Sequence, residues 1–406
     1  MTDWIDREQL RALFKPGDTV YVGATTNEPH GLLDQLGGLS GLHFIQQPIG
    51  VVNKRDLSAV GDNCTQDTFF MTGYLKEGVA SGRVKFIPMQ MRAIYTHLAE
   101  RSIDVTLLLA AKDINGDLRF GMNNDYVTAA LGSSKITIVE VSDAFISPIG
   151  SLLVADQADY FYASNTPAGV YPITEIDDVS RTIGKLVSDL IRDGDCIQTG
   201  VGAVPAAILS GLTDRSDLGL HSGLIDDSAM KLIKAGNMNG RCKNIDKGIH
   251  MTGMAMGGLE LFDWLKDEKS VQFKSADYTH EMSIIQQLDN FVSINSAVEI
   301  DLFGQINAEV VNGKQISGTG GSVDFMRATK SSKGGRSIVA LSATARKGTI
   351  SRIVNKVEMV TALRTDVDIV VTEFGVANLK SASLAERAEA LIAVAHPDFR
   401  DQLKSS

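Results

Sequence analysis

A pattern of strand, glycine turn and helix occurs twice in this chain, and it constrains the fold more than any other feature. In the first copy, the apolar run 19–22 is followed by a polar turn and then by leucines at helical spacing. Gly23 recurs as Gly200, 177 residues later, and Gly17 recurs at the same distance. Because a repeat of this length corresponds to a whole domain, we predict two copies of one α/β domain of about 180 residues each.

Buried strands are predicted between the two copies. The runs 105–110 and 136–141 are continuously apolar and have the length of strands in a parallel sheet. The stretch 166–180 carries prolines and little periodicity, which is typical of a linker. The fold class that we expect is therefore α/β, with two related open domains, 1–165 and 181–406, built on mostly parallel sheets.

A stretch near the C-terminus, residues 294–352, is rich in glycine turns that lie beside apolar runs. The turns are 318–321, 334–335 and Gly348, and the run 337–341 reads as a buried strand. Glycine allows a ligand to approach backbone amides closely, and open α/β sheets build their ligand crevices from such turns. Basic residues gather here in a chain of net charge −10. This combination predicts an anionic ligand against the turns.

Composition excludes several classes of function. The chain has 406 residues, of which 44% are apolar and 22% charged, as in ordinary soluble proteins. A net charge of −10 argues against nucleic acid as a partner. The three cysteines and seven histidines show no metal-ligand spacing, so we predict no catalytic metal. A polar N-terminus and the lack of a run of about 18 apolar residues predict a cytoplasmic protein that does not engage a membrane.

One family pattern matches the second half of the chain almost without a break from 293 to 399. The matching segments are 293–297, 299–305, 317–321, 323–325, 345–353, 371–377, 386–388 and 396–399. In these segments the chain resembles the acetyl-CoA hydrolase/transferase family, a branch of the class I CoA-transferases that includes the 4-hydroxybutyrate CoA-transferase-like proteins. The first half is similar in a looser way. The resemblance implies two α/β halves with the active site in the cleft between them, and a homo-oligomer.

The resemblance also implies acyl-CoA chemistry. Coenzyme A is then a substrate or product, and a carboxylic acid is the second substrate. In the family, a glutamate in a His, hydroxyl residue, Glu pattern attacks the acyl-CoA and forms an anhydride and then a thioester. Here the pattern reads His221, Ser222, Gly223, so Gly223 occupies the position of the nucleophilic glutamate. Three hypotheses therefore remain: a CoA-transferase that uses another carboxylate, a hydrolase or carbon–carbon lyase without a glutamyl-CoA intermediate, and a non-catalytic acyl-CoA-binding module.

Candidate site residues follow from the same matches. The resemblance implies that the amides of Gly320 and Gly321 hold the oxyanion and that the turn with Glu28 faces the same site. With Gly223 at the glutamate position, we predict Glu28, the best remaining carboxylate, as a general base on water, and His221 as a residue that orients this water or binds the substrate. The implied substrate-binding residues are Thr25, Asn27, Ser222, Gly223, Ser317, Gly318 and Thr319. The implied coenzyme A-binding residues are Lys333, Arg346, Lys347, Gly348, Glu373, Gly375, Val376 and Ala377. Each also has a structural interpretation: a charge at a helix N-terminus for Glu28, a strand-end histidine for His221, and solvated surface charges for the basic residues.

Overall fold

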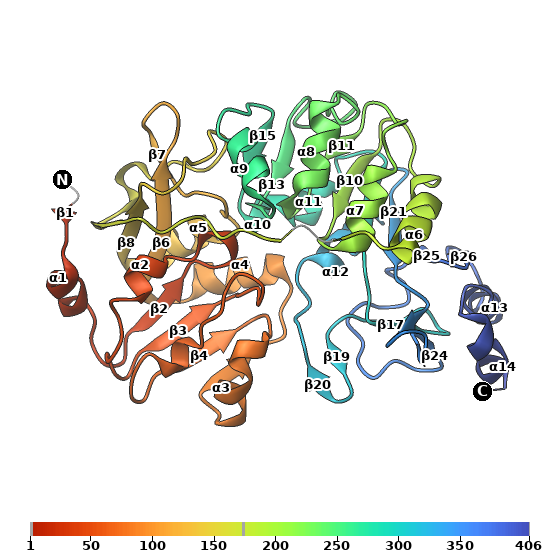
Figure 1. Cartoon of the computed structure of the whole chain (residues 1–406), viewed down its shortest axis with the longest axis horizontal. Helices are drawn as coiled ribbons and strands as arrows, with labels where there is room; N and C mark the ends of the chain where they lie inside the picture. The colour runs from red at the N-terminus through yellow and green to blue at the C-terminus, as the bar shows by residue number, and fades with distance from the viewer. Residues whose placement is uncertain (1–2, 173–174, 406) are drawn as a thin grey trace. The chain divides into compact units, whose positions relative to one another are not determined.

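The computed structural model describes residues 3–172 and 175–405, which form two compact units (Figure 1). Unit 1 comprises Met1–Pro172 and Thr252–Tyr278, and unit 2 comprises Ile173–Met251 and Thr279–Ser406. This division differs from the contiguous domains that the sequence predicts, because a segment of the second half folds with unit 1. The predicted linker 166–180 includes residues 173 and 174, which lie outside the described residues.

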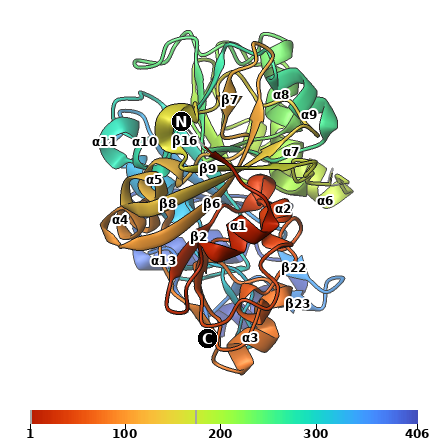
Figure 2. The ribbon, with the colours of Figure 1, turned by 90° about the vertical axis from the view of Figure 1, so that its left-hand side faces the viewer.

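Unit 1 is built on a nine-stranded sheet in the order β1-β9-β8-β6-β2-β3-β4-β5, with β7 paired to β6. The strands are β1 Asp3–Trp4, β2 Thr19–Val22, β3 His43–Gln46, β4 Thr65–Thr68, β5 Val84–Phe86, β6 Ile103–Lys112, β7 Leu118–Arg119, β8 Ser134–Ser142 and β9 Tyr160–Ser164. Every pair along this order is parallel, and only β7 runs antiparallel to its neighbour. The strands predicted at 105–110 and 136–141 are confirmed as parts of β6 and β8 (Figure 2).

Helices cover this sheet. They are α1 Arg7–Ala12, α2 His30–Leu33, α3 Lys76–Ala80, α4 Met91–Glu100 and α5 Val127–Ser133. The later segment Thr252–Tyr278, which also belongs to unit 1, contains β14 Met254–Ala255, α9 Leu259–Leu265, β15 Val271–Phe273 and most of α10 Ala276–Thr279. Leu10 of α1 and Leu32 of α2 join alternate strand residues such as Val20 and Leu107 in one buried cluster. Each such side chain contributes about 1.5–3 kcal/mol by leaving water. This burial fixes α2, and therefore the turn before it, against the sheet.

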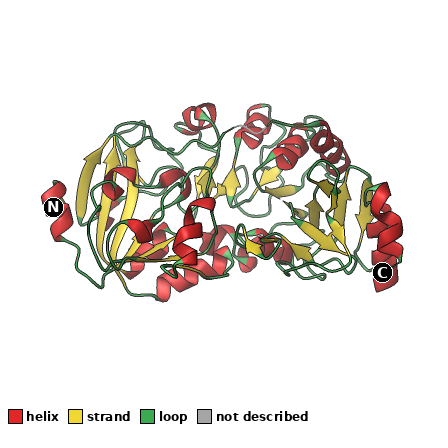
Figure 3. Ribbon diagram, turned by 60° about the horizontal axis from the view of Figure 1, so that its bottom comes forward, coloured by secondary structure: helices red, strands yellow, loops and turns green. Residues whose placement is uncertain are grey.

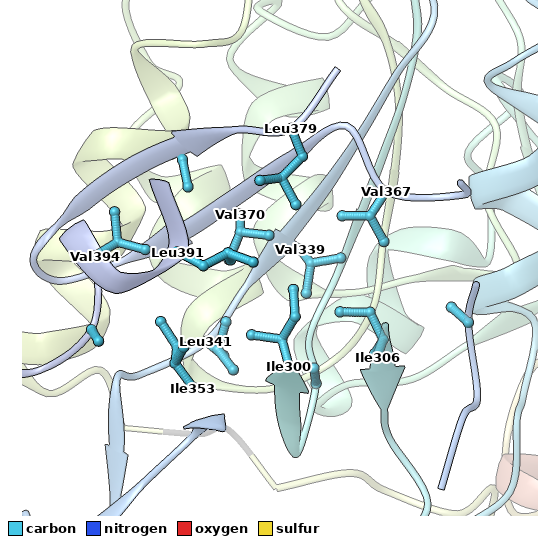
Figure 4. Close-up of a cluster of buried hydrophobic side chains, with 14 of the residues drawn as sticks. Ile300, Ile306, Val339, Leu341, Ile353, Val367, Val370, Leu379, Leu391 and Val394 are labelled. Carbon is cyan, nitrogen blue, oxygen red and sulfur yellow. The ribbon is translucent and has the colours of Figure 1, made fainter. Parts of the chain in front are cut away.

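Unit 2 has a six-stranded sheet in the order β11-β10-β16-β21-β25-β26. Its strands are β10 Cys196–Thr199, β11 Gly219–Leu220, β16 Phe291–Asn295, β21 Arg336–Ala340, β25 Ile369–Thr372 and β26 Gly375–Asn378. All pairs are parallel except β25 with β26. A small sheet of β17 Glu299–Asp301, β18 Ile306–Asn307 and β24 Ile353–Val354 packs its isoleucines against β21 and β25 (Figure 4).

Shorter strands and the helices complete unit 2. The strands are β12 Leu224–Ile225, β13 His250–Thr252 at the boundary of the units, β19 Val310–Val311, β20 Lys314–Gln315, β22 Thr344–Ala345 and β23 Ile350–Ser351. The helices are α6 Asp178–Ser188, α7 Ala203–Ser210, α8 Asp227–Lys234, α11 Met282–Ile285, α12 Ser322–Ala328, α13 Leu384–Ala393 and α14 Arg400–Lys404 (Figure 3). No helix in residues 3–172 and 175–405 is both long and apolar enough to cross a membrane.

The repeated pattern folds in the same way in both units. Gly17 and Gly194 both adopt a left-handed backbone, with φ of +98° and +79°. The carboxylates of Asp18 and Asp195 each accept a hydrogen bond from the backbone amide three residues earlier, at 2.7 Å in both cases. In each sheet the order of strands reverses once, between β2 and β6 in unit 1 and between β10 and β16 in unit 2. Ligands of open α/β sheets bind at the carboxyl ends of strands beside such a reversal.

Candidate functional site

The turn after β2 lies at the reversal point of the unit 1 sheet, and it is buried and rigid. Thr25 has a left-handed backbone with φ of 58°. Its amide donates to Asn53 Oδ1 at 2.9 Å, and Asn53 Nδ2 donates back to the Thr25 carbonyl at 3.1 Å. The Thr25 hydroxyl oxygen accepts a hydrogen bond from the side-chain amide of Asn123. A strained threonine held on three sides in this way is typical of a functional turn.

The side chain of Asn27 connects the turn after β2 to two other segments of unit 1. Its Nδ2 donates to the carbonyls of Leu109 at 2.8 Å and Phe120 at 3.1 Å, and its Oδ1 accepts from the Met122 amide at 3.3 Å. A Cβ on Gly121 would lie 2.2 Å from Asn27 Oδ1, so only glycine fits there. These bonds tie the turn to β6. The substrate contact that the resemblance implies for Asn27 stays a prediction, and the structure shows a positioning role.

Glu28 is a buried carboxylate in the same turn, with 2% of its surface exposed. Gln46 Nε2 donates to its Oε1 at 2.7 Å, and its Oε2 lies 3.1 Å from His30 Nδ1. Burial raises the pKa of Glu28 above its ordinary value, and the charge of His30 and the hydrogen bond of Gln46 oppose this rise. A carboxylate with a raised pKa, held by an amide and an imidazole, is suited to accept a proton from water.

Glu28 does not cap the helix that follows it. The first turn of α2 is capped instead by Glu140 of β8, which is fully buried and accepts from the Gly31 and Leu32 amides at 3.1 and 2.8 Å. Pro29, the residue before α2, makes no side-chain cap. The helix-charge interpretation of Glu28 therefore loses its main support, since another carboxylate performs that role.

Asp125 is a further candidate in unit 1 that the sequence did not single out. It is 2% exposed, and burial raises its pKa to about 8, which favours the protonated form of its carboxyl group. Its amide donates to Asn123 Oδ1 at 2.9 Å, and Asn123 contacts Thr25. In the sequence, the only indication of Asp125 is the polar run before α5, and such runs are common in loops.

His221 and Ser222 lie at the carboxyl end of β11 in unit 2. His221 is fully buried, with its Nε2 3.1 Å from the Thr279 carbonyl oxygen. The Ser222 hydroxyl donates to the Thr199 carbonyl at 3.3 Å, and the Ser222 amide donates to the Met251 carbonyl at 3.0 Å. These contacts fix the backbone of Gly223 in a buried position beside the reversal point of the sheet.

The sequence Gly-Leu-His occurs at 41–43 and again at 219–221, but the two copies are not structural counterparts. Thr19 of β2 pairs with His43, whereas Cys196, the equivalent position of β10, pairs with Gly219. His43 is therefore the first residue of β3, whereas His221 follows the last residue of β11. The similarity in sequence is shifted by two residues relative to the similarity in structure, so His43 carries no information about the role of His221.

Two aspartates that follow Gly223, Asp226 and Asp227, lie at the N-terminus of α8. Asp226 precedes α8 and accepts from the amides of Ser228 at 3.1 Å and Ala229 at 2.9 Å. Burial raises the pKa of Asp226 to about 6 in spite of these bonds. Because both of its cap bonds serve the helix, Asp226 is a weak candidate for replacing the missing glutamate.

The glycine turn 318–321 leads from β20 into α12. Gly320 has a left-handed backbone with φ of +54°, and a Cβ added there would meet nothing within 4 Å. The Ser317 hydroxyl donates to the Ala308 carbonyl at 2.8 Å and fixes the start of the turn. Gly321 is the residue before α12. The space beside Gly320 lets a ligand approach the backbone, as the predicted oxyanion role of Gly320 and Gly321 requires.

The basic candidates for coenzyme A divide into two places. Arg346 lines a groove of about 290 Å³ together with Arg352 and the apolar side chains of Ile316 and Ile350. Burial lowers the pKa of Arg352, and the nearby charge of Glu373 opposes this change. Lys333 lies elsewhere, in the turn before β21, at the amino edge of the sheet. The structure therefore groups Arg346 with Arg352 and does not bring Lys333 to them.

The hairpin between β22 and β23 presents its cations from a strained backbone. Arg346, Lys347 and Gly348 all have left-handed φ values, of 47°, 57° and 88°. Non-glycine residues in this conformation cost about 1 kcal/mol or more each. The Glu373 carboxylate accepts from the Ala343 amide at 2.8 Å and holds the base of this hairpin. Gly375, Val376 and Ala377 lie in the edge strand β26 that follows.

We expect Lys347→Gly to be at least as stable as the wild type, because glycine removes the left-handed strain of about 1 kcal/mol. Lys356→Gly is the matched control, since Lys356 is exposed and is not among the residues with positive φ. It should lose about 0.5–1 kcal/mol of unfolding free energy. Urea unfolding of both variants measures the difference. An equal loss in both would show that the Lys347 backbone is not strained.

The described residues, 3–172 and 175–405, contain no group of three histidine, cysteine, aspartate or glutamate side chains that could hold a metal ion. Unit 1 offers the carboxylate of Glu28, which can accept a proton. Unit 2, described by itself, offers backbone amides and guanidinium groups, which can hold a carbonyl oxygen and bind an anion.

Known proteins resemble this chain along almost all of its length. Residues 257–406 match the family model described as the acetyl-CoA hydrolase/transferase C-terminal domain. The chain is 36% identical over 377 residues to the 4-hydroxybutyrate coenzyme A transferase of Clostridium kluyveri, covering 91% of this chain and 87% of that protein. It is 34% identical over 368 residues to the butyryl-CoA:acetate CoA-transferase of Anaerostipes caccae, covering 86% and 81%. The crystal structure of RipA from Yersinia pestis matches with a TM-score of 0.91 at 30% identity, covering 99% of this chain and 96% of that one.

Proposed function

Because the chain belongs to the acetyl-CoA hydrolase/transferase family, we propose that it cleaves the thioester bond of an acyl-CoA. The CoA passes to a second carboxylic acid or is released when water accepts the acyl group. The relatives are enzymes, and this excludes the non-catalytic binding module that the sequence left open. Cleavage of a carbon–carbon bond has no support in the named relatives.

The observation that carries this proposal is the buried carboxylate of Glu28. The Glu28 carboxylate is 2% exposed, hydrogen-bonded to Gln46 and close to His30. Burial of a carboxylate costs folding free energy, and proteins commonly keep such a group where it has a chemical use. Its raised pKa fits a general base that removes a proton from water or from an incoming acid. Asp125 lies in the loop that contacts the same turn, and it supplies a second buried carboxyl group with a raised pKa.

Unit 2 offers the groups that the coenzyme requires. The groove is lined by the guanidinium groups of Arg346 and Arg352, which suit phosphates, and by the apolar walls of Ile316 and Ile350, which suit an adenine ring. The carboxylates of Glu299 and Glu358 also line it, so a phosphate would bind at the arginine side of the groove. The turn at Gly320 provides backbone amides for the oxygen of the reacting carbonyl. In this scheme, binding of the distant nucleotide drives the reaction at the thioester.

Water is the acceptor that a second observation favours. A transferase that works by two covalent steps needs a carboxylate nucleophile, and position 223 is glycine. Asp226, three residues after Gly223, caps α8 through its Oδ1. Because Asp226 has this structural role, we favour direct attack by water at the thioester over attack by its carboxylate.

Product analysis tests the proposal. Purified protein is incubated with acetyl-, propionyl-, butyryl- and succinyl-CoA, each with and without acetate or succinate, and the CoA species are identified by mass spectrometry. Free CoA released without an added acid would establish hydrolysis, and a new acyl-CoA formed from the added acid would establish transfer. The absence of both with every acyl-CoA of this panel would overturn the proposed function for these short acyl groups.

A further inference from the structure

The side chain of His280 occupies the space above Gly223. A Cβ added at residue 223 would lie 2.9 Å from both Cε1 and Nε2 of the His280 imidazole. This is closer than real Cβ atoms approach other heavy atoms, so any side chain at this position requires the ring to move. His280 therefore presents its Nε2 edge at the point from which a side chain of residue 223 would project.

The imidazole of His280 is held firmly in this place. Its Nδ1 lies 2.8 Å from the Thr279 hydroxyl oxygen, and its ring lies 4.5 Å from the ring of Phe325, measured between centroids. The carbonyl of the same threonine lies 3.1 Å from His221 Nε2. Thr279 thus orients both histidines, and Phe325 of α12 fixes the plane of the His280 ring.

The chemistry of this imidazole is that of a neutral donor. His280 is 3% exposed, and burial together with the charge of His221 lowers its pKa to about 3. The ring therefore carries one proton at neutral pH. When the Thr279 hydroxyl donates to Nδ1, that proton resides on Nε2, at the edge that faces Gly223. A neutral N–H held in a buried place is well suited to stabilise a carbonyl oxygen as it becomes negative.

We propose that His280 is a catalytic residue, whose Nε2 contacts the thioester carbonyl of the acyl-CoA above Gly223. This inference rests on the proposed function and adds a residue to it. In the step, the oxygen of water attacks the carbonyl carbon and passes a proton to a base, and the C–S bond breaks. The CoA thiolate takes up a proton, and the carboxylic acid leaves. His280 donates a hydrogen bond throughout, and no bond to the protein forms.

Three substitutions at His280 separate its two nitrogens. Glutamine can place its amide near the position of Nε2, asparagine reaches only as far as Nδ1, and phenylalanine keeps the ring and its contact with Phe325 but has no nitrogen. We expect His280→Asn and His280→Phe to lower kcat by about 100-fold with KM changed less than about threefold. His280→Gln should stay within about tenfold of the wild type.

The outcomes separate this inference from the proposed function. Wild-type kcat in His280→Asn and His280→Phe would overturn the role of His280 while leaving thioester cleavage in place. An equal loss in all three variants would overturn the assignment to Nε2. No turnover by the wild type would overturn the proposed function, and this inference with it. Thermal unfolding of each variant identifies any loss that is due to misfolding.

A double-mutant cycle provides an independent test of the contact. Gly223→Ala introduces the Cβ that meets the ring, so it should lower kcat by displacing His280. In a His280→Ala background the ring is absent, and Gly223→Ala should then have little further effect. Equal effects of Gly223→Ala in both backgrounds would show that the two residues are not coupled and would overturn the proposal.

Discussion

Replacing Glu28 by glutamine is expected to lower kcat by at least about 100-fold, because the variant keeps the shape of the side chain and loses the base. Glutamine can still accept from Gln46 and can donate to His30 Nδ1, so the turn should keep its structure. Glu77→Gln is the matched control, because Glu77 is an exposed glutamate of α3 in the same unit. A rate for Glu28→Gln near that of the wild type would exclude Glu28 as the base.

The pH dependence follows from the direction of the pKa shift. Only the deprotonated form of Glu28 can accept a proton, so kcat/KM should rise with pH through an apparent pKa above the ordinary glutamate value of 4.5. This acidic limb should disappear in Glu28→Gln. Rate profiles from about pH 4 to pH 8 with one acyl-CoA, for both proteins, measure the effect. An unchanged limb in the variant would assign it to a different group.

The raised pKa of Glu28 also affects stability, and stability depends on pH in the opposite direction to activity. A carboxyl group whose pKa is raised in the folded protein binds its proton more tightly there than in the unfolded chain. It therefore contributes stability at low pH, and that contribution is lost as the pH rises through the raised pKa. At neutral pH the ionised Glu28 opposes folding. Glu28→Gln should consequently be at least as stable as the wild type while it is inactive, as expected for a residue kept for function.

The sequence predicted the elements whose signals are local. The apolar runs that became β6 and β8 and the α/β class depend on periodicity over short distances. The repeated strand and turn were also recognisable, because Gly17 and Gly194 are needed for the same left-handed backbone.

Features that depend on long-range contacts were not predictable. Nothing within residues 252–278 indicates that they fold with unit 1, because their partners lie more than 100 residues earlier, as for the Ala276 amide and the Asp125 carbonyl. Asn27 reads as an ordinary polar turn residue until its bonds to Leu109 and Phe120 are seen. His280 and Gly223 lie in separate segments of the chain, so a single sequence does not indicate that they lie side by side.

Glu140 of β8 anchors the short helix α2, and this helps to fix the turn that carries Glu28, two residues before the helix. Its carboxylate accepts from the Ser164 hydroxyl at 2.6 Å as well as from the amides of Gly31 and Leu32. A Cβ on Gly31 would lie 2.6 Å from Glu140 Oε1, so the close approach depends on glycine. The α2 helix is only four residues long, and such a helix has little stability of its own.

Glu140→Leu should therefore lower the free energy of unfolding by about 2–4 kcal/mol, since it leaves the buried Leu32 amide and the Ser164 hydroxyl without their acceptor. The Gly31 amide keeps one acceptor, the Thr166 hydroxyl oxygen at 3.1 Å. Urea unfolding measures the loss, with the exposed Glu100→Leu of α4 as the control that changes the same atoms on the surface. Turnover at a temperature where the variant is still folded should also fall at least about tenfold, because Glu28 lies only two residues before the start of α2. Gly31→Ala should reproduce both effects while keeping the carboxylate. Wild-type stability of Glu140→Leu would mean that the α2 amides find other acceptors and that packing alone fixes the turn.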